Sequence, residues 1–232
     1  MRFVCDEWRQ KYFIELIQSV GGTTATEGTA DDVFMQNTHV LGSTVWNTEQ
    51  LTRSSVLANL LREHKDYQTT IWDYSLENMD ILAQHNISAV YKPYVTPAWE
   101  IAMLKDLLQP VYDVAFVGAM STRRYTILKE LMDRGLSVRI IQDFGLERDK
   151  QIGQCRVLLN IHYSEEYKIF ESVRCNRWMA AGLLVVTEEG LGQKLDDPPN
   201  AVPYKDLVST VLDRLSLPHD SDRPDVNNAA QN

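Results

Sequence analysis

The sequence has no long hydrophobic run and only three cysteines among its 232 residues. No apolar stretch approaches the roughly 20 residues that a membrane-spanning helix needs, so we expect a soluble protein without a transmembrane segment. Residues 1–10 carry charges too early for the apolar core of a secretory signal. Cys5, Cys155 and Cys175 are odd in number and lack metal-ligand spacing, which favours reduced thiols and a cytoplasmic location.

Basic side chains are also scarce, with 23 lysines and arginines against 32 aspartates and glutamates and a net charge of −9. Binding to nucleic acid without sequence preference needs a basic surface, so we expect no nucleic-acid partner. A small anionic ligand is compatible with this charge, because a few arginines in a pocket suffice to bind it. The second half supplies such arginines at positions Arg123, Arg124, Arg139, Arg148, Arg174 and Arg177.

Short apolar runs alternate with helical patterns in the first half of the chain. The expected strands are residues 2–5, 32–37, 43–47, 69–75 and 88–95. The expected helices are residues 8–20, 48–64 and 76–85. The first helix has apolar residues at helical spacing on one side, namely Trp8, Tyr12, Leu16 and Val20. Thr48 is expected to be the N-cap of the second helix.

The same alternation continues in the second half. The expected strands are residues 112–119, 137–144, 156–163 and 183–189. The expected helices are residues 123–135, 146–155, 165–182 and 204–216. Strands alternating with helices predict parallel sheets covered on both faces, so the predicted class is α/β with two small Rossmann-like parallel-sheet domains facing each other across a cleft.

The predicted domain boundaries follow from prolines and from composition. The first domain is residues 1–95, and the second is residues 111–217. Residues 96–110 form a connector helix, because a helical pattern there lies between Pro97 and Pro110. Residues 218–232 are polar and almost free of aromatic residues, so we expect a disordered tail.

Residues 112–124 contain the most informative motif, "YDVAFVGAMSTRR". A buried strand ends at Gly118, the hydroxyls of Ser121 and Thr122 follow, and Arg123 and Arg124 begin a helix. Proteins hold phosphate at helix starts that offer free N–H groups, hydroxyls and positive charge. Cations at a helix N-terminus oppose the helix dipole unless an anion lies between them, which favours a phosphate site over an ordinary strand-to-helix turn.

Polar residues also follow the next two strands of the second half. Asp143 and Phe144 come after one strand, and Asn160 and His162 come at the end of the next. Ligands bind beyond the carboxyl ends of the strands in sheets of this type, so these residues are candidates for the same site. His162 is either a hydrogen-bonded histidine at a strand end or a donor to a diphosphate or a sugar hydroxyl.

Glu171 and Arg174 are three residues apart in a predicted helix, on the inward-facing stripe of Tyr167, Trp178 and Ala181. An intrahelical ion pair is one reading of this spacing. Charged side chains rarely face a protein core, however, unless they bind a partner there. The alternative is that Glu171 binds the hydroxyls of a ribose and Arg174 binds a phosphate.

The first half offers candidates for a general base that deprotonates an acceptor hydroxyl. Asp6 and Glu7 follow the first strand, His39 follows the second, and Glu49 lies in the first turn of a predicted helix. Each is also compatible with a helix cap or a solvated charge.

The sequence resembles a known family. The run "YDVAFVGAMSTRRYTILKELMDRGLSVRII", followed by "LLNIHYSEEYKIFESVRCNRWMAAGLLVVTEE", resembles the donor-binding domain of GT-B-type glycosyltransferases. In the first half, "VWNTEQL", "TTIWDYSLENMDIL" and "VYKPYV" are similar to the acceptor-side domain of small members. The likeness covers residues 1–217, and "FESVR" and "AAGLLVVTEE" are its most specific pieces.

The resemblance implies transfer of a sugar from a nucleotide-sugar donor to a hydroxyl of a glycan, lipid-linked or protein acceptor. It implies that no metal or other cofactor is needed. The donor's phosphates would lie at Gly118, Ser121, Thr122 and Arg123. Its base would lie near Asp143 and Phe144, and its ribose at Glu171. The glutamate that retaining members often carry eight residues before Glu171 is replaced by Tyr163, so the stereochemical outcome stays open.

Two other classes of function compete with this reading. One is a homologue that binds a nucleotide or a sugar but has no turnover. The other is an NAD-type oxidoreductase or epimerase, which is disfavoured because no strand is followed by the G-x-G-x-x-G pattern.

Overall fold

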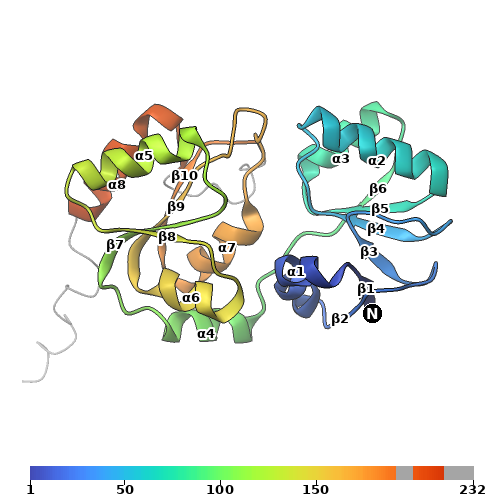
Figure 1. Cartoon of the computed structure of the whole chain (residues 1–232), viewed down its shortest axis with the longest axis horizontal. Coiled ribbons are helices and arrows are strands. Elements are labelled where there is room, and N and C mark those ends of the chain that lie inside the picture. Colours follow the sequence, from blue (N-terminus) through green and yellow to red (C-terminus); the bar gives the residue numbers. More distant parts are fainter. Residues whose placement is uncertain (192–200, 217–232) are drawn as a thin grey trace, which may run out of the picture.

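A computed structural model describes residues 1–191 and 201–216 (Figure 1). Within these residues, the strands form two all-parallel sheets of six and five strands. Each sheet is the centre of one lobe, which confirms the predicted α/β class with two parallel-sheet units. The tail predicted for residues 218–232 lies outside the described residues.

The N-terminal lobe has the sheet order β2-β1-β3-β4-β5-β6. Its strands are β1 (Arg2–Val4), β2 (Thr23–Ala25), β3 (Val33–Met35), β4 (Thr44–Asn47), β5 (Thr70–Asp73) and β6 (Ala89–Tyr91). Its helices are α1 (Glu7–Ser19), α2 (Ser54–Tyr67) and α3 (Leu76–Gln84). Helix α1 covers one face of the sheet, and α2 and α3 cover the other (Figure 1).

The turn between β4 and α2 differs from the prediction. Helix α2 begins at Ser54, not at Thr48, and its N-cap is Arg53 without a side-chain cap bond. The hydroxyl of Thr48 instead accepts a hydrogen bond from Gln36. The side chain of Asn47 binds the backbone of Glu49, and such local side-chain bonds stabilise turns at the expense of helix. Strand β2 was not expected from the sequence.

Helix α1 buries a different face from the predicted one. Phe13, Leu16 and Ile17 pack against the sheet, whereas Trp8 and Tyr12 are 60% and 53% exposed. The helix carries two overlapping apolar stripes, and the sheet is covered by the one that includes Phe13. Tyr12 is therefore left at the edge of the lobe.

The C-terminal lobe has the sheet order β11-β10-β9-β7-β8. Its strands are β7 (Tyr112–Val117), β8 (Val138–Ile141), β9 (Cys155–Asn160), β10 (Leu184–Glu188) and β11 (Ala201–Val202). Its helices after residue 110 are α5 (Thr122–Asp133), α6 (Gly145–Gly153), α7 (Ser172–Ala181), η2 (Tyr204–Asp206) and α8 (Leu207–Ser216). The strand order reverses between β7 and β9, which is where ligands bind in doubly wound sheets.

The predicted connector contains α4 (Ala98–Asp106), which packs onto the C-terminal lobe. Leu104 is fully buried in the same core as α6 and α7, and α5 and α8 cover the opposite face of the sheet (Figure 1). A Cβ at Gly153 would lie 2.3 Å from the carbonyl oxygen of Leu107, so a glycine is needed where the connector crosses the end of α6.

The helix predicted for residues 165–182 begins only at Ser172. Residues 161–171 form a loop that reaches the N-terminal lobe (Figure 1). The side-chain amide of Gln50 both donates to the carbonyl of Ile169 and accepts from its N–H, at 2.9 and 2.8 Å. Thr52 donates to the carbonyl of Glu166. These contacts satisfy backbone groups that a helix would otherwise pair internally.

Candidate functional site

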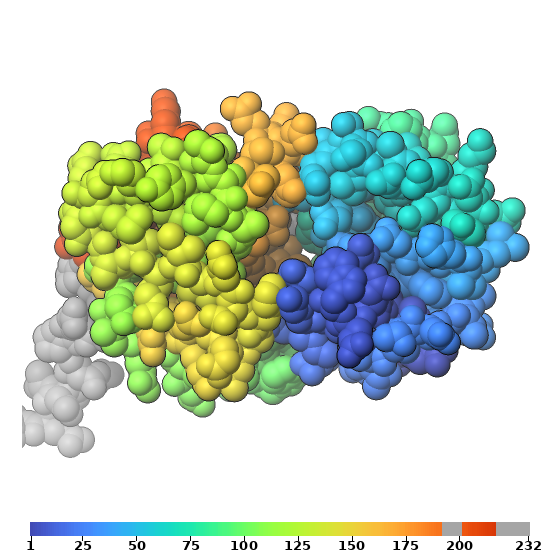
Figure 2. All heavy atoms as spheres, in the orientation of Figure 1, coloured from blue at the N-terminus to red at the C-terminus, as the bar shows by residue number. Residues whose placement is uncertain are grey.

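A cavity of about 640 Å³, here called the inter-lobe pocket, is lined by residues of both lobes. Helix α1 contributes Lys11, Tyr12 and Glu15. The C-terminal lobe contributes residues 117–120 from the end of β7 onward, residues 141–144 from the end of β8 onward, and residues of α6 and α7. The space-filling view shows a hollow between the lobes, with atoms of the region around residue 170 set back in it (Figure 2).

The inter-lobe pocket brings together five of the predicted donor-binding residues. They are Gly118, Asp143, Phe144, Glu171 and Arg174. The other predicted donor-binding residues do not line the pocket, although several lie directly behind its wall. The predicted bases of the N-terminal lobe also lie outside its lining.

The turn after β7 has a conformation that favours glycine. Gly118 has a φ of +137°, and a Cβ there would lie 3.1 Å from Nη1 of Arg124. Ser121 is the N-cap of α5, where its hydroxyl accepts from the N–H of Arg124 and donates to the carbonyl of Tyr163. The start of α5 therefore approaches the pocket with the Arg124 guanidinium directly behind Gly118.

Arg124 is a buried cation without a carboxylate partner among the described residues. Its side chain is 6% exposed, and it donates to the carbonyls of Ile161 and Ala119 at 2.9 and 2.7 Å. Burial, reinforced by the nearby Arg174, lowers the pKa of Arg124 to about 10. The site therefore holds positive charge at a cost that a bound anion would offset.

Arg174 lies beside Arg124 and lines the pocket. Its Nη1 donates to the amide oxygen of Asn160 at 2.9 Å, and Asn160 in turn donates to the hydroxyl of Thr187. Asn160 is fully buried and so orients Arg174 instead of contacting a ligand itself. The intrahelical ion pair with Glu171 does not form, since Glu171 is the N-cap residue of α7 and accepts from Gln50 at 2.8 Å.

Arg123 points away from the pocket. Its guanidinium forms a bidentate ion pair with Glu188 and stacks on the ring of Tyr204 at 3.7 Å. The anion that we predicted near this helix start is thus supplied for Arg123 by the protein itself. Thr122 is exposed in the first turn of α5 and does not line the pocket.

His162 is a buried strand-end histidine. It is 5% exposed, its backbone N–H donates to Glu188, and its ring lies against Gly190, where a Cβ would be 2.9 Å from Cε1. Burial lowers the pKa of His162, although Glu188 opposes that effect. The ring is buried as in the structural alternative, but its Nε2 is enclosed without a hydrogen-bond partner among the described residues, so the choice between the two predicted roles stays open.

Arg177 shows how this lobe compensates a buried cation. It is 2% exposed and pairs with Glu100 at 2.5 Å, Asp149 at 2.9 Å and Glu15 at 3.2 Å. Burial alone would lower the pKa of Arg177, but these three carboxylates raise it above its ordinary value. Glu15 belongs to α1 and also pairs with Arg148 at 2.6 Å, so the network joins the two lobes. Its partners come from α1, α4 and α6, so no local sequence pattern reveals it.

Aromatic rings from both lobes meet at the pocket. Tyr12 and Phe144 make an edge-on contact with centroids 4.8 Å apart, and Nζ of Lys11 lies 4.8 Å from the Phe144 ring centroid. Asp143 accepts a hydrogen bond from Gln151. Phe144 is 37% exposed, so a planar group can stack on it.

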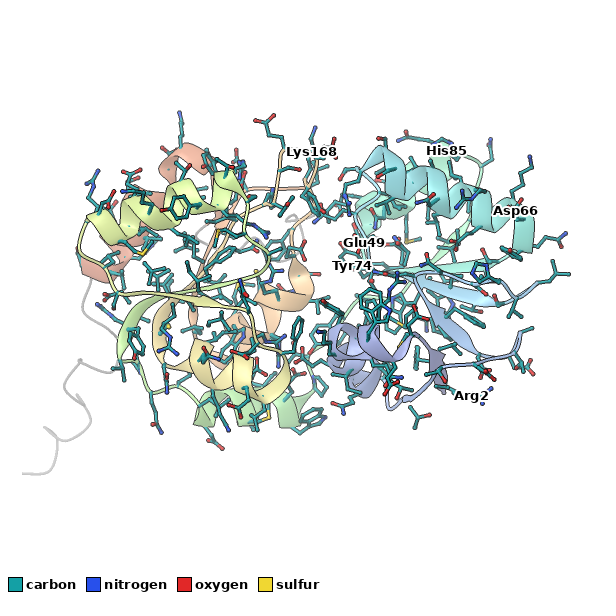
Figure 3. All side chains as sticks on the ribbon, viewed as in Figure 1. Arg2, Glu49, Asp66, Tyr74, His85 and Lys168 are labelled. Carbon is teal, nitrogen blue, oxygen red and sulfur yellow. The ribbon has the colours of Figure 1, made fainter. Side chains whose placement is uncertain are left out.

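The carboxylate of Glu49 already has two partners within the protein. It pairs with Arg53 at 2.9 Å and accepts from Gln36 at 3.1 Å. Glu49 and Tyr74 both lie at the edge of the N-terminal lobe that faces the C-terminal lobe (Figure 3). Glu49 thus lies on the correct side for a base, but its carboxylate would have to exchange partners to act.

The remaining predicted bases lie elsewhere. Asp6 and Glu7 are exposed at the start of α1 and outside the pocket lining, and Asp6 is 3.8 Å from Arg9. The ring of His39 contacts Tyr67, the last residue of α2, so it lies near the amino-terminal edge of the sheet.

The ends of β4 and β5 are fastened together by two asparagines. The amide of Asn47 donates to the carbonyl of Glu49 at 2.9 Å and to Asp73 at 2.6 Å. The amide of Asn78 donates to the same carbonyl and to both oxygens of Asp73. Asp73 is fully buried, and burial raises its pKa to about 6 against these hydrogen bonds.

The described residues contain no cluster of three or more His, Cys, Asp or Glu side chains placed to bind a metal ion. Among the same residues, none of the helices combines the length and apolar character of a membrane span.

The chain is similar to uncharacterized proteins of Acanthamoeba polyphaga mimivirus. One is 35% identical over 178 residues, which cover 72% of this chain and 20% of the relative. A second is 37% identical over 183 residues, which cover 73% of this chain and 58% of the relative. The chain therefore spans less than two thirds of the length of either protein. It matches no protein-family model and no solved structure.

Proposed function

We propose that the protein is a metal-independent glycosyltransferase that moves a sugar from a nucleotide-sugar donor to a hydroxyl acceptor. The observation that carries this proposal is the pair Arg124 and Arg174. The Arg124 guanidinium lies at the turn after β7, the Arg174 guanidinium lies near it at the end of β9, and neither pairs with a described carboxylate. Within the same lobe, the buried Arg177 has three carboxylate partners. The difference favours a site that is completed by a ligand's phosphates.

The pocket suits a nucleotide-sugar in size and chemistry. A volume of about 640 Å³ is within the usual range of roughly 300–1,000 Å³ for small-molecule sites. In the proposed complex, the diphosphate lies against residues 118–120 and Arg174. The ribose lies at Glu171, and the base stacks on Phe144. Two Rossmann-like lobes would then face each other across a donor cleft, as the resemblance to GT-B-type glycosyltransferases implies.

The proposed reaction is an attack of the acceptor hydroxyl oxygen on the anomeric carbon of the sugar. The bond from that carbon to the diphosphate oxygen breaks, and the nucleotide diphosphate leaves with the bonding electron pair. Arg174, Arg124 and the N–H groups at the start of α5 stabilise the charge that develops on it. The proton of the acceptor hydroxyl passes to a base of the N-terminal lobe, for which Glu49 is the candidate. The acceptor is a glycan, a lipid-linked molecule or a protein.

The second candidate is a nucleotide- or sugar-binding protein without turnover. The engagement of Glu49 by Arg53 and Gln36 favours it, because the candidate base is then not free to take the proton. A transfer or donor-hydrolysis assay distinguishes the two, since a binding protein retains nucleotide affinity but releases no sugar.

A thermal-shift screen against UDP, GDP, ADP and NAD tests the proposed function. A ligand present at about 100 times its dissociation constant stabilises the folded state by about 2.7 kcal/mol, which raises the melting temperature of a protein of this size by about 5–10 °C. We expect such a rise with one nucleoside diphosphate and none with NAD. A flat response to all three diphosphates contradicts the proposal, and a response to NAD alone favours the oxidoreductase class.

A further inference from the structure

Tyr74 follows β5 at the edge of the N-terminal lobe that faces the other lobe (Figure 3). Its side chain is 8% exposed, yet no described residue forms a hydrogen bond with its hydroxyl. The oxygen is not among the enclosed atoms that lack a partner, so it faces accessible space. Buried tyrosines usually find a partner for the hydroxyl, and one that does not is available to a ligand.

The surroundings hold Tyr74 in a fixed place. Asn47 and Asn78 each bind both Asp73 and the carbonyl of Glu49, which ties the residue before Tyr74 to the end of β4. The next residue along that segment, Gln50, is 2% exposed and donates to Glu171 across the lobes at 2.8 Å. Glu171 lines the inter-lobe pocket. The phenol of Tyr74 is therefore held near Glu171 on the N-terminal side, although Tyr74 is not itself among the residues that line the pocket.

The charge around Tyr74 defines what the hydroxyl can do. Burial raises the pKa of Tyr74 well above its ordinary value of 10.0, and the carboxylates of Glu171, Asp73 and Glu49 raise it further. The hydroxyl stays protonated at physiological pH, so it can donate a hydrogen bond but cannot act as a base. A ligand group beside it can accept from the phenol, and the negative charge nearby favours a group that can also donate a hydrogen bond. A sugar hydroxyl can do both, since it is a donor and an acceptor.

We propose that the Tyr74 hydroxyl is the hydrogen-bond donor by which the N-terminal lobe recognises a hydroxyl of the transferred sugar. This assignment rests on the proposed function and makes Tyr74 a residue that determines sugar specificity. The nucleotide part of the donor is held by the C-terminal lobe and does not contact Tyr74. The contribution of Tyr74 therefore appears only when the sugar is present.

The test is a calorimetric comparison of nucleotide diphosphates with the corresponding nucleotide-sugars. Wild-type protein, Tyr74→Phe and the control Tyr125→Phe are each titrated with UDP, UDP-glucose, GDP and GDP-mannose. Tyr125 is 49% exposed on α5 and outside the pocket lining. We expect Tyr74→Phe to bind the diphosphate within about twofold of wild type and the nucleotide-sugar about 3- to 10-fold more weakly. The control should change neither affinity.

The outcomes separate this inference from the proposed function. If wild-type protein binds none of the four ligands, the proposed function fails and the role of Tyr74 fails with it. If wild type binds a diphosphate and its sugar, but Tyr74→Phe weakens both equally or neither, the role of Tyr74 is overturned and the proposed function stands. Thermal unfolding of Tyr74→Phe without ligand establishes that the variant is folded, as the retained ring packing leads us to expect.

Discussion

The two lobes share an architecture but differ in whether the charged side chains at their strand ends have partners within the protein. In the N-terminal lobe, Asp73 is held by Asn47 and Asn78, and Glu49 is paired with Arg53. In the C-terminal lobe, Arg124 and Arg174 have carbonyl or amide oxygens but no described carboxylate as partners. The parallel sheets bring strand ends together in both lobes. The carboxylates at the strand ends of the N-terminal lobe have partners within the protein. The two arginines of the C-terminal lobe lack a carboxylate partner and can bind an anion.

The contrast between compensated and uncompensated charge is also present within the C-terminal lobe. Arg177 and Arg124 are both buried, at 2% and 6% exposed. Three carboxylates surround Arg177, and its pKa is raised, whereas the pKa of Arg124 is lowered. We interpret Arg177 as a residue that joins the lobes and Arg124 as part of a binding site.

The largest expected effect is on stability and comes from removing these two cations in turn. Arg177→Met leaves the buried Glu100 without its cation and leaves Glu15 and Asp149 with Arg148 alone, so it should lower the free energy of unfolding by about 3–5 kcal/mol. Arg124→Met removes an uncompensated charge and leaves two carbonyls without a donor, so it should cost only about 1–2 kcal/mol. Urea unfolding of both variants measures the difference. Equal losses of unfolding free energy in the two variants would show that the carboxylates around Arg177 do not distinguish it from Arg124.

The next effect concerns the buried carboxylate of the N-terminal lobe. Burial raises the pKa of Asp73 from 3.8 to about 6, so its contribution to stability is full below pH 3.8 and is lost as the pH rises to about 6. The loss amounts to about 3 kcal/mol, because one pKa unit corresponds to about 1.4 kcal/mol. Asp73→Asn removes the titration while keeping a polar side chain.

Urea unfolding of wild type and Asp73→Asn between pH 4 and pH 7 measures this contribution. The stability of wild type relative to the variant should fall as the pH rises through that range. A difference that does not depend on pH would show that Asp73 is not held in a raised-pKa state.

A smaller effect is expected from the aromatic rings of the pocket. Phe144→Ala should weaken binding of the nucleotide by about 1–2 kcal/mol, because a base that stacks on an aromatic ring gains about that much. Trp99 is a control, since it is an aromatic residue 55% exposed on α4 that does not line the pocket. Calorimetry should therefore find the affinity of Trp99→Ala unchanged. An equal loss in both variants would mean that Phe144 does not stack on the base.

Much of the fold could be predicted from local patterns. The alternation of apolar runs and helical segments places β7, β8, β9 and β10 within two or three residues of their observed limits. The pocket residues Gly118, Asp143 and Phe144 follow from the rule that sites lie at the carboxyl ends of parallel strands. These features depend on short stretches of sequence and on a general property of the sheet.

Other features depend on distant contacts and could not be predicted. Residues 165–171 have a helical pattern but form a loop, because Gln50 from the other lobe binds the backbone of Ile169. Arg123 and Arg124 look equivalent in sequence. Only Arg123 forms an ion pair with Glu188, which lies 65 residues further along the chain. Tyr74 carries no motif, and its place near Glu171 depends on the asparagines that fix the ends of β4 and β5.

The most direct test of the central claim is a calorimetric titration of a nucleoside diphosphate into wild type, Arg174→Gln and Arg123→Gln. Arg174 lines the pocket without a carboxylate partner, whereas Arg123 is paired with Glu188 outside the lining. We expect Arg174→Gln to lose about 1.5–3 kcal/mol of binding free energy, as for a hydrogen bond to a charged group, and Arg123→Gln to bind as wild type does. Wild-type affinity in Arg174→Gln, or a loss confined to Arg123→Gln, would contradict the claim.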